Sequence, residues 1–215
     1  MGAPDFASLP HIGEAVRRKE DYRFLTGGGQ YTDDVNLANQ RYAVFVRSPH
    51  AHAVIKSVDV SKAEAMPGVA KVFTGKDVEG KMGGLPCGWL ITGTDGQPMK
   101  EPPHPILAQG KVRYVGDHVA MVVADSVEQA KNAAEAVDVD YDVLPAVVDV
   151  RDAAKGTALH EAAPDNHCYK WALGDKAQVD AAFAGAAHVT KLDLINNRLI
   201  RNAMEPRAAI GCCKR

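Results

Sequence analysis

The stretch that decides the fold is KVRYVGDHVAMVVADSVEQAKNAAE, residues 111–135. Its first part predicts two strands separated by a turn at Gly116-Asp117, and the second strand is apolar almost throughout, which is typical of burial on both faces. Ser126 and Gln129 have the spacing of a capping box and predict the start of a helix. A narrow stripe of small apolar residues along this helix indicates that it lies closely on a sheet.

Further strands are predicted on both sides of this stretch. Residues 42–48 and 53–60 are rich in β-branched and aromatic residues, and Pro49 favours a break between them. Residues 61–68 predict a short helix capped by Ser61, and residues 69–74 a further strand. Apolar and acidic residues alternate in AVDVDYDV, residues 136–143, which predicts a half-exposed strand. The sequence therefore indicates an α+β fold.

The rest of the chain is less regular. The first forty residues show no helical periodicity and predict an extended arm or a turn. Residues 80–105 form a long loop rich in Gly and Pro, and loops of this length usually have a function or contact a partner. Residues 166–175 and 188–199 predict strands, and between them Asp175 and Gln178 predict the start of a helix that ends at Gly185.

Composition excludes several classes of function. The 215 residues carry 25 Lys and Arg against 27 Asp and Glu. No basic stripe with interleaved aromatic residues occurs, so binding to nucleic acid or to a membrane surface is not expected. No apolar run could span a bilayer and no targeting signal is evident, so we expect a cytoplasmic location. The expected partners are small molecules or proteins.

The candidate site residues do not combine into a recognisable site. His50 and His52 could share a face of a strand and hold a metal, or His52 could act as a base, but no third ligand is evident and a structural or exposed role is expected. The glycines at 27–29 precede no helix that could bind phosphate, so a tight turn is expected. Prolines flank Lys100 and argue against a biotin- or lipoyl-type hairpin.

Two further groups are expected to be structural. Three aspartates on one strand, Asp138, Asp140 and Asp142, are spaced too far apart to converge on one ion and predict a solvated face. Four cysteines, Cys87, Cys168, Cys212 and Cys213, show no paired spacing and are expected to be reduced thiols. We therefore name no catalytic, cofactor-binding or metal-binding residue in this chain.

Six stretches in order along the chain together resemble one family. They are RFLTGGGQYTDD (23–34), FVRSPHAHA (45–53), MPGVAKVFTGKDV (66–78), RYVGDHVAMVVADS (113–126), AAEAVDVDYDVLPAVVD (133–149) and NNRLIRNAMEPRAA (196–209). This pattern is similar to the N-terminal part of the molybdenum-binding large subunit of the xanthine dehydrogenase, aldehyde oxidase and aerobic carbon monoxide dehydrogenase group.

The resemblance implies a specific organisation: an N-terminal arm over residues 1–21, an α/β-hammerhead domain over 22–150, a linker over 151–166 and an incomplete molybdopterin-binding domain over 167–215. It implies an oxidoreductase of aldehydes, N-heteroaromatics or carbon monoxide that uses a molybdenum-molybdopterin cofactor. Its partners would be the remainder of the large subunit, an iron–sulfur subunit, a possible FAD subunit and a small-molecule substrate.

Two departures from the family pattern lie near the end of the chain. Arg201 stands where a proline is usual, and the final CCKR replaces the usual continuation of a strand. We expect a chain cut short, with a genuinely short gene product as the alternative. Such a fragment is not expected to bind the cofactor or to be active alone. A second hypothesis is a non-enzymatic hammerhead module that docks on a separately encoded cofactor subunit.

Overall fold

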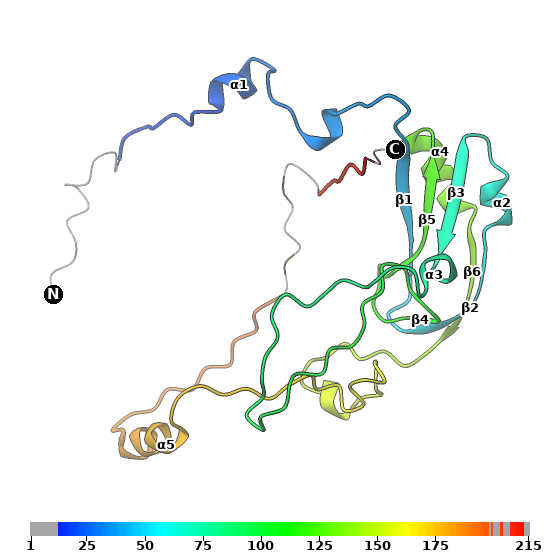
Figure 1. The fold of residues 1–215 in the computed structure, drawn as a ribbon. Coiled ribbons are helices and arrows are strands. Elements are labelled where there is room, and N and C mark those ends of the chain that lie inside the picture. Colours follow the sequence, from blue (N-terminus) through cyan, green and yellow to red (C-terminus); the bar gives the residue numbers. More distant parts are fainter. Residues whose placement is uncertain (1–12, 198, 200–202, 204–206, 213–215) are drawn as a thin grey trace. The chain divides into compact units, whose positions relative to one another are not determined.

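A computed structural model describes residues 13–197, 199, 203 and 207–212. The chain divides into two units, one comprising Gln40–Lys191 and the other comprising Met1–Asn39 with Leu192–Arg215. Arg201 and Cys213, which the sequence singled out, lie outside the described residues. All six strands of the described residues belong to the unit Gln40–Lys191 (Figure 1).

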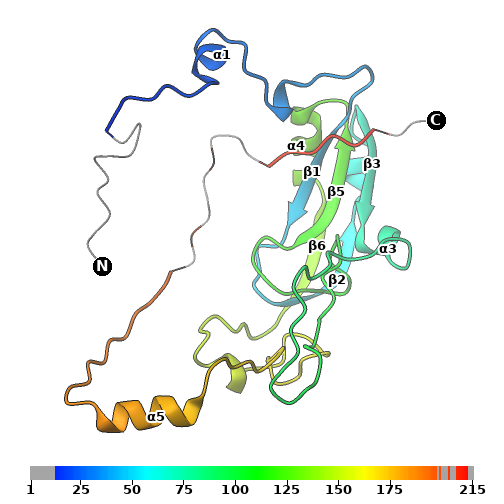
Figure 2. The ribbon, with the colours of Figure 1, turned by 60° about the vertical axis from the view of Figure 1, so that its left-hand side comes forward.

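Two antiparallel sheets of three strands each build this unit. One sheet has the order β1 (Tyr42–Arg47), β5 (His118–Ala124), β3 (Val69–Thr74), and the other has the order β4 (Lys111–Val112), β2 (Ala53–Asp59), β6 (Asp138–Val143). The strands on either side of Gly116-Asp117 do not pair with each other, because β4 joins β2 in the other sheet. Strand β5 lies between β1 and β3 (Figure 2). The predicted turn therefore connects two sheets.

The apolar residues of β5 contribute to both hydrophobic clusters of the unit. Helix α4 (Val127–Glu135) packs against β1 and β5. One cluster contains Ala63, Val72, Ala120, Val122 and Ala133, and the other contains Ala53, Ala108, Val112 and Val119. Since Val119 and Ala120 point to opposite faces of the strand, β5 is buried on both faces as its sequence predicts.

The ends of two helices confirm the predicted caps. Ser126 Oγ accepts a hydrogen bond from the Gln129 N–H at 3.2 Å and caps α4. Asp175 accepts one from the Gln178 N–H at 3.1 Å and caps α5 (Lys176–Gly185). In α4 the small residues Ala130 and Ala133 face the core, whereas α5 buries no residue.

The shorter helices differ from the predictions. The predicted Ser61 cap of α2 (Ser61–Glu64) is wrong, because the Ser61 N–H donates instead to Asp59 Oδ1 at 2.9 Å. Helix α3 (Gly75–Val78) was not predicted. It starts at a capping box in which Asp77 Oδ2 accepts hydrogen bonds from the N–H and Oγ1 of Thr74, at 2.7 and 2.8 Å.

The long loop forms a small ribbon with a later segment. Backbone hydrogen bonds join Gly93 to Gln97 and Met99 to Ile91 at 2.8 and 2.9 Å. Further backbone bonds run from the Thr94 N–H to Lys170 O at 2.9 Å and from the Lys100 N–H to Cys168 O at 2.8 Å.

The strands predicted for this later part of the chain are wrong. Among the described residues, neither 166–175 nor 188–197 forms a strand. Residues 168–170 bond instead to the irregular loop, and 188–197 have no neighbouring strand to complete a ladder.

The described residues of the other unit begin at Gly13 and contain two short helices. Asp21–Leu25 forms the one-turn helix α1, and Thr32–Asp34 forms the 3₁₀ turn η2. The prediction of an extended arm or a turn did not include α1, in which Asp21–Leu25 form a single helical turn. Of the glycines at 27–29, Gly27 lies in the turn that ends α1 and adopts a φ of +75°, whereas Gly28 and Gly29 follow without regular structure. That value favours glycine because it has no Cβ.

Candidate functional site

The two histidines that the sequence singled out have separate surroundings. The His50 ring meets the Tyr141 ring edge-on, with centroids 5.0 Å apart. His52 is only 3% exposed, and its Nδ1 lies 2.9 Å from the carbonyl oxygen of Pro145. A carbonyl only accepts, so Nδ1 carries the hydrogen. No group of three His, Cys, Asp or Glu that could hold a metal occurs in the described part of the chain.

The other candidates also make local contacts. Lys100 forms an ion pair with Asp165 at 2.7 Å, and Asp140 forms one with Lys56 at 3.7 Å. The described cysteines Cys87, Cys168 and Cys212 are free thiols. The structure thus brings none of the sequence candidates together, and the expectation that this chain contains no catalytic or ligand-binding residue stays a prediction.

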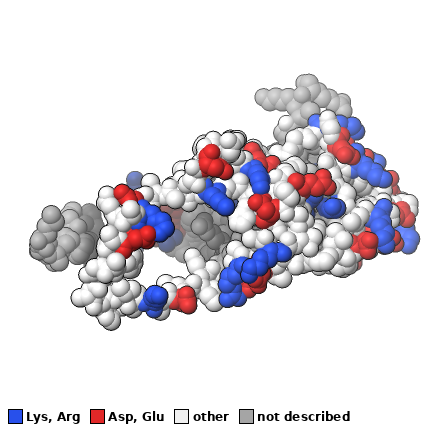
Figure 3. Space-filling view, turned by 90° about the horizontal axis from the view of Figure 1, so that it is seen from below, with Lys and Arg blue, Asp and Glu red and all other residues white. Residues whose placement is uncertain are grey.

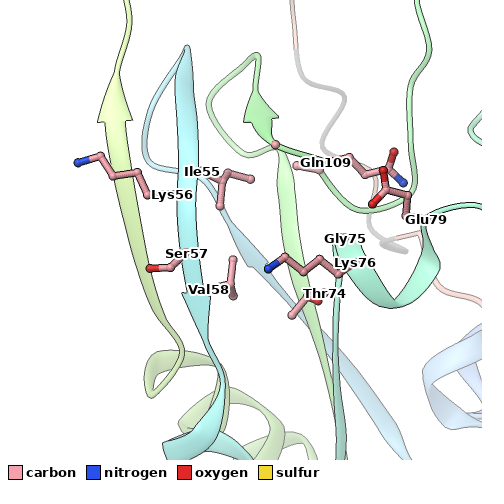
Figure 4. A pocket seen from close by; sticks show the side chains of 11 residues that line it. Ile55, Lys56, Ser57, Val58, Thr74, Gly75, Lys76, Glu79 and Gln109 are labelled. Atoms are coloured by element: carbon pink, nitrogen blue, oxygen red, sulfur yellow. The ribbon is translucent and has the colours of Figure 1, made fainter.

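A pocket of about 380 Å³ lies between β2 and α3 (Figure 4). Strand β4 pairs with β2 only at Ala53 and Val54, and the Ile55 N–H donates to Gly110 O at 2.9 Å, so the part of β2 after Ile55 has no strand partner on that side. The lining residues are Ile55, Lys56, Ser57, Val58, Thr74, Gly75, Lys76, Glu79, Ala108, Gln109 and Gly110.

The charges of this pocket do not fit a molybdenum-pterin cofactor. Lys76 extends toward β2 (Figure 4), and within the described residues it forms no ion pair. Lys56 and Glu79 also line the pocket. Lys56 is paired with Asp140 at 3.7 Å, and the Glu79 carboxylate adds a negative charge that opposes an anionic ligand. A large anionic pterin needs many converging donors, and no mechanistic step through that cofactor follows from these residues.

A polar cluster near the turn between β4 and β5 escaped the sequence analysis. Asp117 is 8% exposed; its Oδ2 accepts a hydrogen bond from the Arg113 N–H at 3.1 Å and its carbonyl accepts one from the Ser48 N–H at 2.8 Å. The Arg113 Nε–H donates to Leu159 O at 2.9 Å. Only the Gly116-Asp117 turn marked this place in the sequence.

Protonation is disfavoured at two histidines beside this cluster, His118 and His160. Burial lowers the pKa of His118, and the nearby Arg47 guanidinium lowers it further, although Asp117 acts in the opposite direction. The His118 ring also stacks on Phe45 at a centroid distance of 4.4 Å. Burial likewise lowers the pKa of His160, with added repulsion from Arg113, His104 and His52.

The outer surface carries both signs of charge. On the face drawn in Figure 3, Lys and Arg side chains alternate with Asp and Glu. This mixture agrees with the balanced composition, and it offers no single-sign field to attract a polyanion. Within the described residues, no helix is long and apolar enough to cross a bilayer.

Comparison with known proteins decides the family. The family described as "Aldehyde oxidase and xanthine dehydrogenase, a/b hammerhead domain" matches residues 26–145, which contain all six strands of the described part of the chain. The chain belongs to the aldehyde oxidase and xanthine dehydrogenase family. This finding confirms both the resemblance read from the six sequence stretches and the predicted hammerhead fold.

Relatives in this family are much longer than the chain. The nicotine 6-hydroxylase large subunit of Paenarthrobacter nicotinovorans is 38% identical, over 98% of this chain and 26% of its own length. The carbon monoxide dehydrogenase large chain of Afipia carboxidovorans is 39% identical, over 85% and 23%. A solved Cu,Mo-CO dehydrogenase superposes with a TM-score of 0.64 at 36% identity, over 80% and 22%. The chain thus spans about a quarter of these relatives.

Proposed function

We propose that this chain supplies the hammerhead part of the large subunit of a molybdenum-dependent oxidoreductase. The observation that carries the proposal is the 38% identity over 98% of the chain with a segment that makes up 26% of a hydroxylase large subunit. The complete enzyme would oxidise an aldehyde, an N-heteroaromatic compound or carbon monoxide. Its partners would be the remainder of the large subunit, an iron–sulfur subunit and an FAD subunit, in the cytoplasm.

The role of this chain in that enzyme would be structural. When bound elsewhere in the large subunit, the molybdenum-pterin cofactor would supply the oxidation chemistry. The residues of this chain instead stabilise the hammerhead. Asp77 caps a helix, Asp117 accepts from the backbone of the β4–β5 connection, and His52 bonds the chain after β6. These polar groups form hydrogen bonds with the main chain, which supports a structural role for this chain rather than a catalytic one.

A graft tests the proposal directly. Residues 26–145 would replace the equivalent residues of the nicotine 6-hydroxylase large subunit, which would be produced with its partner subunits. We expect the chimera to accumulate, retain molybdenum and hydroxylate nicotine. The matched control carries Val122→Asp, which buries an unpaired carboxylate in the core and should abolish accumulation. A chimera that accumulates but lacks molybdenum would contradict the proposal.

The isolated chain provides a second test. We expect neither stoichiometric molybdenum nor dye reduction with an aldehyde or a purine when the chain is purified from a host that makes the cofactor. The physical reason is that a bound pterin and an oriented base require groups from several loops. Stoichiometric molybdenum, or turnover that disappears when tungstate replaces molybdate in the medium, would show a site in this chain.

A non-enzymatic module is the second candidate. The observation in its favour is that every residue of both core clusters, including the partly buried ones, lies between Val46 and Tyr141. Such a core does not depend on the segments on either side. DNA sequence downstream of the coding region would discriminate the two. An overlapping frame for a cofactor domain favours the enzyme, whereas a separate gene for that domain favours the module.

A further inference from the structure

The pocket beside β2 lies along a strand edge that the fold leaves open. Strand β2 pairs with β6 along its whole length on one side, but on the other side β4 reaches only Ala53 and Val54. Beyond Ile55, no strand of the described residues pairs with β2 on the pocket side. The opposite wall of the pocket comes from the end of β3 and the start of α3 (Figure 4). The pocket therefore continues the line of β4 along residues 55–58.

The open edge of β2 carries no feature that blocks strand pairing. Proteins usually protect exposed edges with charged side chains or proline. Ile55, Ser57 and Val58 are uncharged, and β2 contains no proline. Lys56 is paired with Asp140 at 3.7 Å and extends away from the pocket (Figure 4). By contrast, β6 forms the outer edge of the same sheet and carries three exposed aspartates. The sheet is thus protected at β6 and open at β2.

The pocket has room for a short extended backbone. Its volume is about 380 Å³. Residues 55–58 span about 10 Å, which corresponds to a ladder of about three or four residues. Ile55 and Val58 are partly buried and pack against the cluster that contains Val112, so the wall formed by β2 is apolar on that face.

One positive charge faces the open edge. Lys76 is exposed, and its side chain extends toward β2 (Figure 4). It forms no ion pair within the part of the chain that the structure describes. The carboxylate of Glu79 also lines the pocket, but Figure 4 shows it well apart from the Lys76 amine. A single carboxylate on a bound segment therefore finds a partner in Lys76.

A ladder this short favours an occupant that belongs to the same polypeptide. Stable interfaces between separate proteins use about 20–30 residues on each side, so about three or four residues bind weakly on their own. A covalent connection raises the effective concentration of the segment to about the millimolar range and makes a weak ladder sufficient. The matched part of the nicotine 6-hydroxylase large subunit is 26% of its length, so most of that subunit remains to supply the segment.

We propose that an extended segment from the remainder of the large subunit adds to the edge of β2 along residues 55–58. Its main chain forms hydrogen bonds with β2, its side chains facing Ile55 and Val58 are uncharged, and one of its carboxylates pairs with Lys76. This inference rests on the proposed function, because the segment belongs to the part of the subunit that this chain lacks.

Photo-cross-linking in the chimera described above identifies the occupant. A benzophenone-bearing phenylalanine replaces Ser57, and cross-linked peptides are identified by mass spectrometry after irradiation. We expect a cross-link to a large-subunit peptide outside the graft that contains an acidic residue, with the mass on a denaturing gel unchanged. The same probe at Asn132, an exposed residue of α4 outside the pocket, should not label that peptide.

The outcomes separate this inference from the proposed function. A cross-link to a partner subunit, a doubled mass that indicates a second copy, or no cross-link in a chimera that retains molybdenum would overturn strand addition and leave the proposed function standing. A chimera that accumulates without molybdenum contradicts the proposed function, and the inference falls with it.

Hydrogen exchange tests the ladder itself. Amides of β2 that gain a partner should be protected at least about fivefold more in the chimera than in the isolated chain, which is the effect of one net hydrogen bond. Equal protection of β2 in both proteins would refute the ladder. Lys76→Glu should lower β2 protection in the chimera about threefold, whereas Lys131→Glu, a matched exposed change on α4, should not. Unchanged protection in Lys76→Glu would exclude the carboxylate partner.

Discussion

Gly75→Ala offers the sharpest test of the packing beside the pocket. Gly75 begins α3, and a Cβ at this position would lie 2.2 Å from Ala108 O and 3.1 Å from Ala108 C. Side-chain carbons essentially never approach another atom within 3.0 Å. Ala108 cannot easily withdraw, because it is 5% exposed and its N–H donates to His118 O at 2.6 Å. The main chain must therefore shift at a buried contact.

The expected cost follows from two opposing effects. Overpacking of a buried site costs about 1–3 kcal/mol, and an anchored main-chain carbonyl places this site near the upper value. Alanine offsets about 1 kcal/mol of this through its helix propensity and the lower entropy of the unfolded chain. We therefore expect the free energy of unfolding to fall by about 2 kcal/mol, which corresponds to a Tm lower by roughly 5–10 °C.

Thermal and urea unfolding, followed by circular dichroism, measure this change. Gly83→Ala is the matched control, because a Cβ at Gly83 meets nothing within 4 Å and its φ is not positive. Its Tm should stay within about 2 °C of the wild type. A Gly75→Ala protein that melts within about 1 °C of the wild type would refute the close approach of α3 and Ala108.

Three further outcomes are expected. Asn166→Ala removes three side-chain hydrogen bonds and places alanine at a φ of +55°, so the loop at 153–166 should become susceptible to protease. Asn166→Gly also removes these bonds but tolerates that φ, so it should be cleaved more slowly than Asn166→Ala. Asp77→Asn should lower the free energy of unfolding at pH 7 but have less effect near pH 3. The Thr74 N–H and hydroxyl lower the pKa of Asp77, so the stabilisation by its carboxylate is present above about pH 3.8 and is lost in acid. Equal destabilisation at both pH values would contradict this. Burial and Arg47 lower the pKa of His118, so the urea midpoint of the wild type should fall as pH drops below about 6.5. His118→Gln should weaken this pH dependence of the urea midpoint. An unchanged pH dependence would exclude His118 as its source.

Local signals explain which elements could be predicted. The apolar run of β5, the alternation in β6 and the Ser126 cap each depend on neighbours within a few residues, and all three are confirmed. Strand partners depend on distant residues. Nothing local to Gly116-Asp117 indicates that β4 turns toward β2, or that residues 168–170 bond to the long loop instead of forming a strand.

The polar contacts could not be predicted for the same reason, because their partners are distant in the sequence. The sequence marks His52 by its nearness to His50, but its role is set by Pro145, which is 93 residues away. The cap of α2 shows the effect on a smaller scale. Serine is a common capping residue, yet the N–H of Ser61 donates a hydrogen bond to the side chain of Asp59. The sequence predicts that a polar side chain needs a hydrogen-bond partner, whereas the fold determines which partner that is.

The position of β5 explains why one stretch carries so much of the fold. Ala120 and Val122 join the cluster beneath α4, while Val119 points the other way and joins the cluster with Ala53 and Val112 of the second sheet. Because β5 is the middle strand of its own sheet and also contacts residues of the other, its residues must be apolar on both faces. The edge strands need only one apolar face. The fold therefore constrains the choice of residues most strongly in β5 and in the helix that follows it.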